Sequence, residues 1–361
     1  MRVLIVINNI SAIGGTERVT THVANLLVKK GFSVDILSIH QPTSSTFFTI
    51  DSSIGQLSLY PHEISLFKSL IPASFKLYSI AKKYDVTIFS DTQMSLLSGL
   101  VALLSKTKVI AWEHFNSTIV TRFGSRWFGR KIAARLSDLV VVLTKQDQEN
   151  WQAKYWLKNP VKVIPNPSSI KIKEKAVDEI RTSTVISVGR YTDQKGFDLL
   201  VQSWAAIDEN IRQSWHLKII GPNGSAKPSL MQQIKKLGLN NVKLADTCAD
   251  MVTEYNNADI YVMSSRYEGF GLTLIEAMSS GLPVVAFDCP MGPGEIIDEQ
   301  YGIIVEQENI SALSEALSQL ITDKELRENL SKQALLRAKD FSEQTIANVW
   351  KPTLINLIEK N

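Results

Sequence analysis

Runs of β-branched and other apolar residues recur along the first half of the chain, separated by amphipathic stretches. Continuous runs of this kind predict strands that are buried on both faces, as in a parallel sheet with helices on each side. The strands expected in this half are 3–7, 33–39, 86–89, 108–112, 139–144 and 161–164.

The pattern stops between residues 165 and 182, where Pro165 and Pro167 precede a charged segment. Proline cannot continue a strand ladder, so this stretch is expected to be a linker. A second series of apolar runs then begins. The strands expected there are 185–188, 217–220, 242–245, 260–263, 284–287 and 303–305.

Three helical stretches close the chain, at 311–320, 324–338 and 342–359. The two alternating series predict an α/β protein with two Rossmann-like, doubly wound domains. Ligands of such sheets bind at the carboxyl ends of the strands, so we expect the two domains to face a central cleft there.

Composition narrows the function classes. The 361 residues are 44% hydrophobic and 21% charged, which is ordinary for a soluble enzyme of two domains. A net charge of +3 is too small to predict nucleic acid as a general partner. Cys248 and Cys289 form neither a CxxC pair nor part of a zinc motif, which favours a reducing cytoplasm.

No apolar run is long enough to predict a membrane span, which needs about 20 residues. The run at 3–7 is also too short for a signal peptide and is better explained as the first strand. Any membrane association is therefore expected to be peripheral.

The stretch 258–286 combines a buried strand, a glycine-bearing turn, a helix and another buried strand. Free N–H groups at the start of such a helix bind phosphate. Glu268 lies in the turn and Glu276 in the helix, and carboxylates accept hydrogen bonds from hydroxyls. A nucleotide-sugar carries both groups. The alternative is that Glu276 lies on a solvated face, although its apolar neighbours predict burial and hence a partner.

Two cations follow the first strand of the second domain. Arg190 ends that strand and Lys195 opens the next helix, so both can meet a diphosphate above one sheet edge. Taken singly, each is better explained as a solvated surface charge, and it is their shared position at one strand end that favours a ligand site.

In the first domain, Gly14 and Gly15 follow the first strand and allow a close approach of the backbone to a ligand. The alternative is a flexible turn capped by Thr16. The spacing is not GxGxxG, which disfavours an NAD-dependent oxidoreductase. His114 follows the strand 108–112 and is either a contact to the reacting groups or a structural histidine.

The segment 121–136 carries five cations and no acid. At helical spacing, Phe128, Ile132 and Leu136 are expected to face the core. A second face would suit an anionic membrane surface. Its residues are Arg122, Phe123, Arg126, Trp127 and Arg130. An ordinary basic surface helix is the alternative.

Together these motifs resemble the retaining glycosyltransferases of family 4, which have the GT-B fold. The similarity covers the Gly14-Gly15 loop, the segment 164–167, Arg190 with Lys195-Gly196, and the Glu268-x7-Glu276 motif with its Gly269-Phe270-Gly271 turn. The order and domain placement of the motifs make the resemblance specific.

The resemblance implies roles for these residues. Arg190 and Lys195 would bind the donor diphosphate, Glu268 the sugar hydroxyls and Glu276 the ribose. The residues expected to bind the donor are Gly14, Gly15, Arg190, Lys195, Glu268, Gly269, Phe270, Gly271, Leu272, Thr273 and Glu276. Those expected to act in catalysis are His114, Glu268, Arg190 and Lys195.

The resemblance also implies that the last helix returns to the first domain. The predicted domains are thus 1–168 with 342–361, on the acceptor side, and 169–341, which binds the donor. No Asp-x-Asp occurs, so we expect neither a metal nor a cofactor. Lys195 and Arg190 would then neutralise the leaving diphosphate. A front-face mechanism giving an α-linkage is expected.

The segments 112–116 and 287–297 look like those of bacterial members that extend lipid-linked glycans for cell-surface polysaccharides. The predicted partners are a nucleotide-sugar, expected to be UDP-linked, a lipid-linked saccharide and the anionic inner face of the plasma membrane, where the enzyme is expected to be held peripherally. Two alternatives are a non-hydrolysing nucleotide-sugar epimerase of the same fold and a non-catalytic nucleotide-binding subunit.

Overall fold

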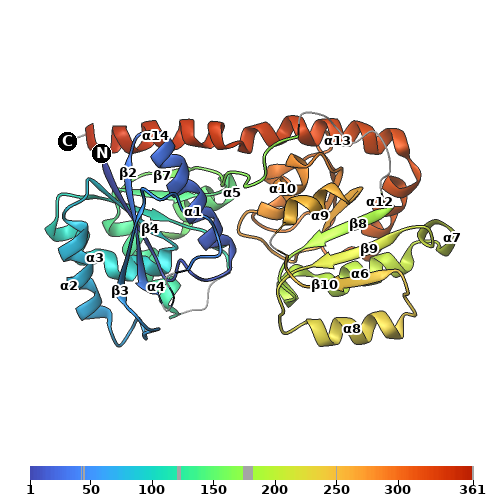
Figure 1. Cartoon of the computed structure of the whole chain (residues 1–361), viewed down its shortest axis with the longest axis horizontal. Coiled ribbons are helices and arrows are strands. Elements are labelled where there is room, and N and C mark those ends of the chain that lie inside the picture. The colour runs from blue at the N-terminus through green and yellow to red at the C-terminus, as the bar shows by residue number, and fades with distance from the viewer. Residues whose placement is uncertain (42, 44, 120–122, 174–181, 249, 360–361) are drawn as a thin grey trace. The chain divides into compact units, whose positions relative to one another are not determined.

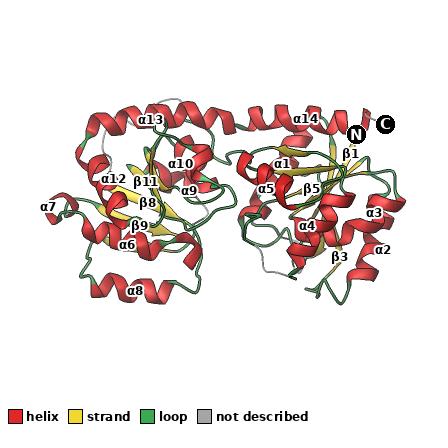
Figure 2. Cartoon of the chain, turned by 180° about the vertical axis from the view of Figure 1, so that it is seen from behind, coloured by secondary structure: helices red, strands yellow, loops and turns green. Residues whose placement is uncertain are grey.

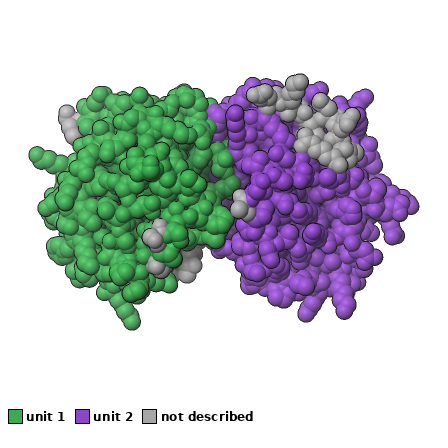
Figure 3. All heavy atoms as spheres, viewed as in Figure 1, with its two compact units in different colours: residues 1–169, 343–361 green, residues 170–342 purple. Residues whose placement is uncertain are grey.

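The computed structural model describes residues 1–41, 43, 45–119, 123–173, 182–248 and 250–359. The chain divides into two compact units, each with its own parallel sheet (Figures 1 and 3). Unit 1 comprises residues 1–169 and 343–361, and unit 2 comprises residues 170–342. The two parallel-sheet α/β domains predicted from the apolar runs are confirmed.

Unit 1 contains a seven-stranded parallel sheet in the order β3-β2-β1-β4-β5-β6-β7. Its strands are β1 (Arg2–Ile7), β2 (Ser33–His40), β3 (Gly55–Tyr60), β4 (Val86–Ser90), β5 (Lys108–Trp112), β6 (Leu139–Val142) and β7 (Val161–Val163). Its α-helices are α1 (Gly15–Lys29), α2 (Leu70–Ala81), α3 (Ser98–Leu104), α4 (Ser125–Leu136), α5 (Lys145–Lys154) and α14 (Glu343–Glu359).

Unit 2 contains a six-stranded parallel sheet in the order β10-β9-β8-β11-β12-β13. Its strands are β8 (Thr184–Val188), β9 (His216–Ile220), β10 (Val242–Ala245), β11 (Ile260–Met263), β12 (Val284–Phe287) and β13 (Ile303–Val305). Its α-helices are α6 (Phe197–Ala206), α7 (Glu209–Arg212), α8 (Lys227–Lys236), α9 (Met251–Asn256), α10 (Leu272–Ser279), α11 (Pro293–Ile296), α12 (Ile310–Thr322) and α13 (Lys324–Ala338).

Helices cover both faces of each sheet (Figure 2), which explains why the central strands are apolar on both sides. Strand β3 was missing from the predicted strands. It lies at the sheet edge and is mostly exposed, so its sequence lacks a continuous apolar run. Residues 174–181 of the predicted linker lie outside the described residues.

Helix α14 belongs to unit 1, where it packs on α1 and on the sheet. Trp350 is buried against Trp112, with 5.2 Å between the ring centroids. Beside it, Lys162 Nζ on β7 donates to the buried Thr353 Oγ1 at 2.7 Å. An apolar face with a few polar contacts at its edge thus fixes the last helix to the first unit.

Both sheets change winding direction at one place, which we call the switch point. In unit 1 the change lies between β1 and β4, and in unit 2 between β8 and β11. The connections leave these neighbouring strands toward opposite faces, so a crevice opens at their carboxyl ends. The segments that follow these four strands are therefore the candidate ligand-binding segments.

Candidate functional site

The switch point of unit 2 brings together the two motifs that were predicted to bind the donor. Strand β8 leads into Gly189–Lys195, and its neighbour β11 leads into the turn that carries Glu268. Lys195 Nζ lies 2.6 Å from Glu268 Oε1. Residues 73 positions apart in the chain thus form one cluster at the end of the sheet.

The Lys195–Glu268 pair is largely buried, with side chains 17% and 8% exposed. Ser265 Oγ donates to the same oxygen, Glu268 Oε1, at 2.6 Å. Among the described residues, none donates a hydrogen bond to the second carboxylate oxygen, Oε2. This oxygen is also not one of the fully buried polar atoms. That oxygen can therefore accept a hydrogen bond from a hydroxyl group of a ligand.

Backbone contacts fix the position of Lys195. Gly196 adopts φ +59°, and a Cβ atom there would lie 2.0 Å from the carbonyl oxygen of Ser264. Ser264 Oγ donates to the carbonyl oxygen of Lys195 at 2.9 Å. Only glycine permits this approach, so the turn after β8 is held directly against the end of β11.

An ion pair at the surface joins the same two segments. Arg266 donates through both terminal nitrogens to the carboxylate of Asp198, at 2.8 and 2.7 Å. Hydrogen bonding to Asp198 raises the pKa of Arg266 further above its usual range, so its charge is permanent. This two-pronged contact ties the Glu268 turn to the first turn of α6.

Arg190 is exposed at the end of β8. No carboxylate of the described residues forms an ion pair with it. The aliphatic part of Lys195 passes over Gly189, where an added Cβ would lie 2.9 Å from Lys195 Cδ and Cε. Lys195 and Arg190 therefore share the switch point and can bind one anion together.

Helix α10 begins directly after the Glu268 turn. Gly271 precedes it with φ +103°, a conformation that favours glycine, and the N–H groups of Leu272 and Thr273 belong to the first turn. Phe270 is buried and Gly269 is partly exposed. The turn thus offers backbone donors beside the Lys195–Glu268 pair.

Glu276 lies on the inner face of α10 and is 1% exposed. Tyr255 Oη donates to Glu276 Oε2 at 3.2 Å. The sequence predicted that this buried carboxylate needs a partner, and Tyr255 is that partner. Tyr261, whose pKa is raised by burial and by the nearby carboxylates, donates to Thr273 Oγ1 at 2.7 Å. Ribose binding by Glu276 stays a prediction.

The switch point of unit 1 contains His114, which follows β5. Its Nε2 lies 3.1 Å from Ser90 Oγ, and Ser90 Oγ lies 2.6 Å from Thr20 Oγ1 on α1. The ring also packs on Trp112 at 4.3 Å between centroids. Burial, together with the positive charge of Arg126, lowers the pKa of His114 to about 4, so the ring is neutral near pH 7.

This lowered pKa predicts a pH dependence of stability. The unfolded chain protonates His114 below about pH 6.5, whereas the folded chain does so only near pH 4. Protonation therefore favours unfolding, and the contribution of His114 makes the protein less stable as the pH falls from 6.5 toward 4. The His114→Gln variant should lose stability less steeply than the wild type when urea unfolding is measured between pH 7.5 and 5. Identical slopes would contradict the assignment.

Gly14 and Gly15 lie where α1 begins. Gly14 is the N-cap residue and has no side-chain cap, and Gly15 is the first helical residue. Thr16 is therefore inside the first turn, and the alternative in which it caps the helix is wrong. The loop is partly exposed, and Ile13 beside it is 52% exposed. A ligand contact by the two glycines stays a prediction.

The predicted orientation of α4 is wrong. Its buried residues are Gly129, Arg130, Ala133 and Ala134, whereas Phe128 is 39% exposed. Gly129 allows α4 to pack closely on the chain after β4, since a Cβ there would lie 2.1 Å from the carbonyl oxygen of Thr92. The apolar spacing of Phe128, Ile132 and Leu136 misplaced the core face for this reason.

Arg130 is fully buried and cannot contact a membrane. Its Nε donates to Glu113 Oε2 at 2.5 Å, and its terminal nitrogens donate to the carbonyl oxygens of Phe115, Asn116 and Ser117. A buried carboxylate needs a buried counter-charge, and Glu113 is 1% exposed. Arg130 therefore supports the loop that follows His114.

The other members of the predicted membrane face do not form an exposed row of arginines. Arg126 pairs with Asp91 through Nε and Nη2, at 3.2 and 2.8 Å. Phe123 is 65% exposed and packs on Trp127, which Lys131 covers at 3.6 Å from the ring centroid. Arg122 lies outside the described residues.

Two features are absent from the part of the chain that the structure describes. Within it, no three or more His, Cys, Asp and Glu side chains are grouped so that they could hold a metal ion. None of its helices combines the length and apolar character that crossing a bilayer requires. Metal independence stays a prediction.

Sequence reasoning missed the side chains that hold the candidate residues in place. Ser265 bonds to Glu268, Ser90 faces His114, and the Arg266–Asp198 pair joins the two turns. Ser90 and Ser265 come one and two residues after predicted strands, a position that could have drawn attention to them. The sequence positions of Arg266 and Asp198 do not predict their pairing.

Comparison with known proteins matches both halves of the chain to family models. Residues 13–169 match "Glycosyltransferase Family 4", and residues 169–337 match "Glycosyl transferases group 1". The matched segments coincide with the greater part of the two units. Each unit therefore carries its own evidence of family membership.

Similar proteins cover nearly the whole chain. An uncharacterized glycosyltransferase of Haemophilus influenzae is 32% identical over 352 residues, which are 96% of this chain and 98% of that protein. The amylovoran biosynthesis glycosyltransferase AmsD of Erwinia amylovora is 29% identical, with 98% and 99% covered. A Campylobacter jejuni α-1,4-N-acetyl-D-galactosaminyltransferase, named for an undecaprenol-diphosphate-linked substrate, is 23% identical, with 93% and 94% covered.

Among solved structures, Anabaena Alr3699/HepE in complex with UDP and glucose superposes with a TM-score of 0.80 at 19% identity. The match covers 99% of this chain and all of that one. At this identity the likeness supports the fold. With the two family models and the relatives, it leads to one conclusion: this chain belongs to glycosyltransferase family 4, has the GT-B fold and is a glycosyltransferase of glycan or polysaccharide biosynthesis.

Proposed function

We propose that the protein is a retaining, metal-independent glycosyltransferase that moves a hexose or N-acetylhexosamine from a UDP-sugar to a lipid-linked glycan. The observation that carries the proposal is the cluster at the switch point of unit 2. It combines two cations, Lys195 and Arg190, with an available carboxylate oxygen of Glu268 and the start of α10. A diphosphate and the hydroxyls of a sugar are complementary to these groups.

In the proposed reaction, Lys195 Nζ turns from Glu268 to the donor diphosphate, where Arg190 joins it. These two charges and the α10 N–H groups stabilise the leaving diphosphate as negative charge develops on it. Glu268 is then released from the ion pair and accepts hydrogen bonds from the sugar hydroxyls. No metal ion is needed for neutralisation in this scheme.

The bond changes follow from this arrangement. The bond between the anomeric carbon and the phosphate oxygen breaks, and the acceptor hydroxyl bonds to the anomeric carbon from the same face. The hydroxyl proton passes to the departing phosphate oxygen. Glu268 accepts hydrogen bonds from Ser265 and, in this scheme, from the sugar hydroxyls, so we assign it to binding rather than to covalent catalysis. An α-linked donor then gives an α-linked product.

The acceptor is proposed from the relatives, since the Campylobacter protein is named for an undecaprenol-diphosphate-linked substrate. His114, neutral near pH 7, is the candidate contact to a sugar or to the acceptor hydroxyl in unit 1. Cys248 and Cys289 are both unpaired, which fits action at the cytoplasmic face of the membrane.

The proposal is tested by incubating the protein with membrane lipids and a panel of labelled UDP-sugars, with and without EDTA. We expect label to move into the lipid-extractable fraction equally well with EDTA, and the new linkage to be α by NMR. Loss of transfer in EDTA that Mg²⁺ or Mn²⁺ restores would contradict the metal-independent mechanism. A donor converted in the absence of any acceptor would instead indicate an epimerase.

A further inference from the structure

Five large apolar side chains are exposed on and beside α2 and α3 of unit 1. We call them the α2–α3 surface. Each side chain is between 57% and 71% exposed, so none of them is part of the hydrophobic core. They are Phe67, Ile71, Phe75, Leu103 and Leu104. Exposed apolar side chains scattered singly need no explanation, but a cluster on adjacent helices indicates an interaction surface.

These side chains belong to one corner of the unit. Ile71 and Phe75 are four residues apart, which places them on one side of α2, and Phe67 lies in the turn that precedes this helix. The opposite side of α2 packs into the core through Ala73, Leu77 and Ala81. The exposed set is therefore additional to the apolar face that folding needs.

Helices α2 and α3 pack against each other, and Figures 1 and 2 both show them side by side at one edge of unit 1. Tyr78 Oη donates to the carbonyl oxygen of Leu104 at 3.3 Å, which joins the last turns of the two helices. Leu103 and Leu104 are thus presented together with the exposed side of α2.

The charges on the two segments that carry this surface are of one sign, and the exposed acids Glu63 and Asp85 lie just outside them. Residues 66–84 and 98–108 contain six lysines and no aspartate or glutamate. Five of these lysines are exposed, and they are Lys68, Lys76, Lys82, Lys83 and Lys106. Apolar side chains flanked by an excess of lysines are complementary to an anionic lipid surface, where the apolar groups enter the bilayer and the lysines contact the headgroups.

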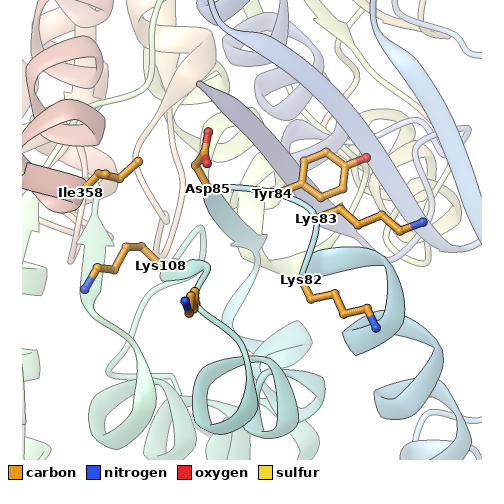
Figure 4. Close-up of a pocket in the computed structure, with 7 residues that line it drawn as sticks. Lys82, Lys83, Tyr84, Asp85, Lys108 and Ile358 are labelled. Atoms are coloured by element: carbon orange, nitrogen blue, oxygen red, sulfur yellow. The ribbon is translucent and has the colours of Figure 1, made fainter. Parts of the chain in front are cut away.

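A shallow hollow of about 210 Å³ continues the basic region. Lys82, Lys83, Lys106 and Lys108 line it together with Tyr84, Asp85 and Ile358. The carboxylate of Asp85 accepts a hydrogen bond from the backbone N–H of Arg2 at 2.7 Å. Figure 4 shows the side chains of Lys82 and Lys83 pointing away from Lys108. Ammonium groups that diverge suit several phosphates spread over a membrane better than one bound ion.

We propose that the α2–α3 surface docks this protein on an anionic lipid bilayer. Its apolar side chains enter the interfacial region, and the surrounding lysines contact the lipid phosphates. The inference rests on the proposed function in one respect, since a lipid-linked acceptor requires the enzyme to work at a membrane. The sequence had predicted a membrane-binding face on α4, but Arg126 and Arg130 of that face are paired with carboxylates. The α2–α3 surface is open to lipid instead.

The test is co-sedimentation of the full chain with vesicles of phosphatidylglycerol and phosphatidylcholine in equal parts, and with vesicles of phosphatidylcholine alone. We expect binding to the anionic vesicles, weakened by salt. The Ile71→Gln/Phe75→Gln variant should lose at least about tenfold in vesicle affinity, and so should the Lys82→Gln/Lys83→Gln/Lys106→Gln variant. The matched controls in unit 2, Met231→Gln/Leu336→Gln and Lys235→Gln/Lys236→Gln, should bind like the wild type.

Two measurements keep this result separate from the proposed function. UDP affinity and thermal stability in solution, without vesicles, should be the same in all four variants and the wild type. Unchanged vesicle binding by both α2–α3 variants would overturn the docking surface and leave the donor site untouched. A wild-type dimer in light scattering that Ile71→Gln/Phe75→Gln dissociates would also overturn it, since a second copy would then cover this surface.

Discussion

Replacing Lys195 by alanine is expected to lower kcat for sugar transfer by roughly 10²–10³-fold, as does the loss of one group that stabilises developing charge in other enzymes. Lys195 is the buried member of the two cations at the switch point, and its ammonium group is 2.6 Å from Glu268. Without it, Arg190 alone would face the leaving diphosphate. Steady-state transfer rates at saturating donor measure the effect.

Two comparisons make the Lys195 result specific. Lys235→Ala removes an exposed lysine of α8 in the same unit and should leave kcat unchanged. Lys195→Arg keeps the charge and should restore part of the activity, since a guanidinium also binds phosphate. Transfer by Lys195→Ala at the wild-type rate under limiting donor would show that the diphosphate is bound elsewhere.

Replacing Arg130 by methionine is expected to destabilise the protein by about 3–5 kcal/mol, the usual cost of removing one partner of a buried ion pair. Glu113 would keep its hydrogen bonds from Thr92 and from the N–H of Phe115 but would lose its counter-charge. Burial and the charge of Glu113 already raise the pKa of nearby Asp147 to about 7, so this part of unit 1 tolerates little additional negative charge. Urea unfolding measures the change.

The control for Arg130 lies one helical turn away. Arg126 is one-third exposed and pairs with Asp91, so Arg126→Met should cost no more than about 1 kcal/mol. Adding Glu113→Gln to Arg130→Met should recover part of the loss, because it removes the unpaired charge. Equal effects of Arg126→Met and Arg130→Met would contradict the distinct burial of the two guanidinium groups.

The fold was largely predictable because its strands are buried on both faces. In strands such as β1, β4 and β11 the apolar run is continuous, so each appears in the sequence without any knowledge of its partners. Strand β3 escaped detection because an edge strand buries one side at most. Its pairing with β2 is a tertiary contact that sequence periodicity does not record.

The candidate site was predictable where it depends on strand ends. Arg190, Lys195 and Glu268 follow strands that the sheet order makes neighbours, and the resemblance to a family supplied that order. The orientation of α4 was not predictable in the same way. Helical spacing alone cannot show that Gly129 allows close packing or that buried Glu113 draws Arg130 inward. A charged residue usually lies on a solvated face of a helix, but Arg130 is buried because it pairs with Glu113.

The central claim is that unit 2 holds the nucleotide part of a sugar donor beside α10, with Glu276 at the ribose and Lys195 at the diphosphate. Calorimetric titration with UDP, comparing the wild type with Glu276→Gln, tests it most directly. The exposed Glu315→Gln of α12 is the control. We expect the wild type and the control to bind UDP alike, and Glu276→Gln to bind it about tenfold more weakly, since a hydrogen bond to a charged group is worth about 1.5–3 kcal/mol. Equal UDP affinity of a folded Glu276→Gln variant and the wild type would contradict the claim.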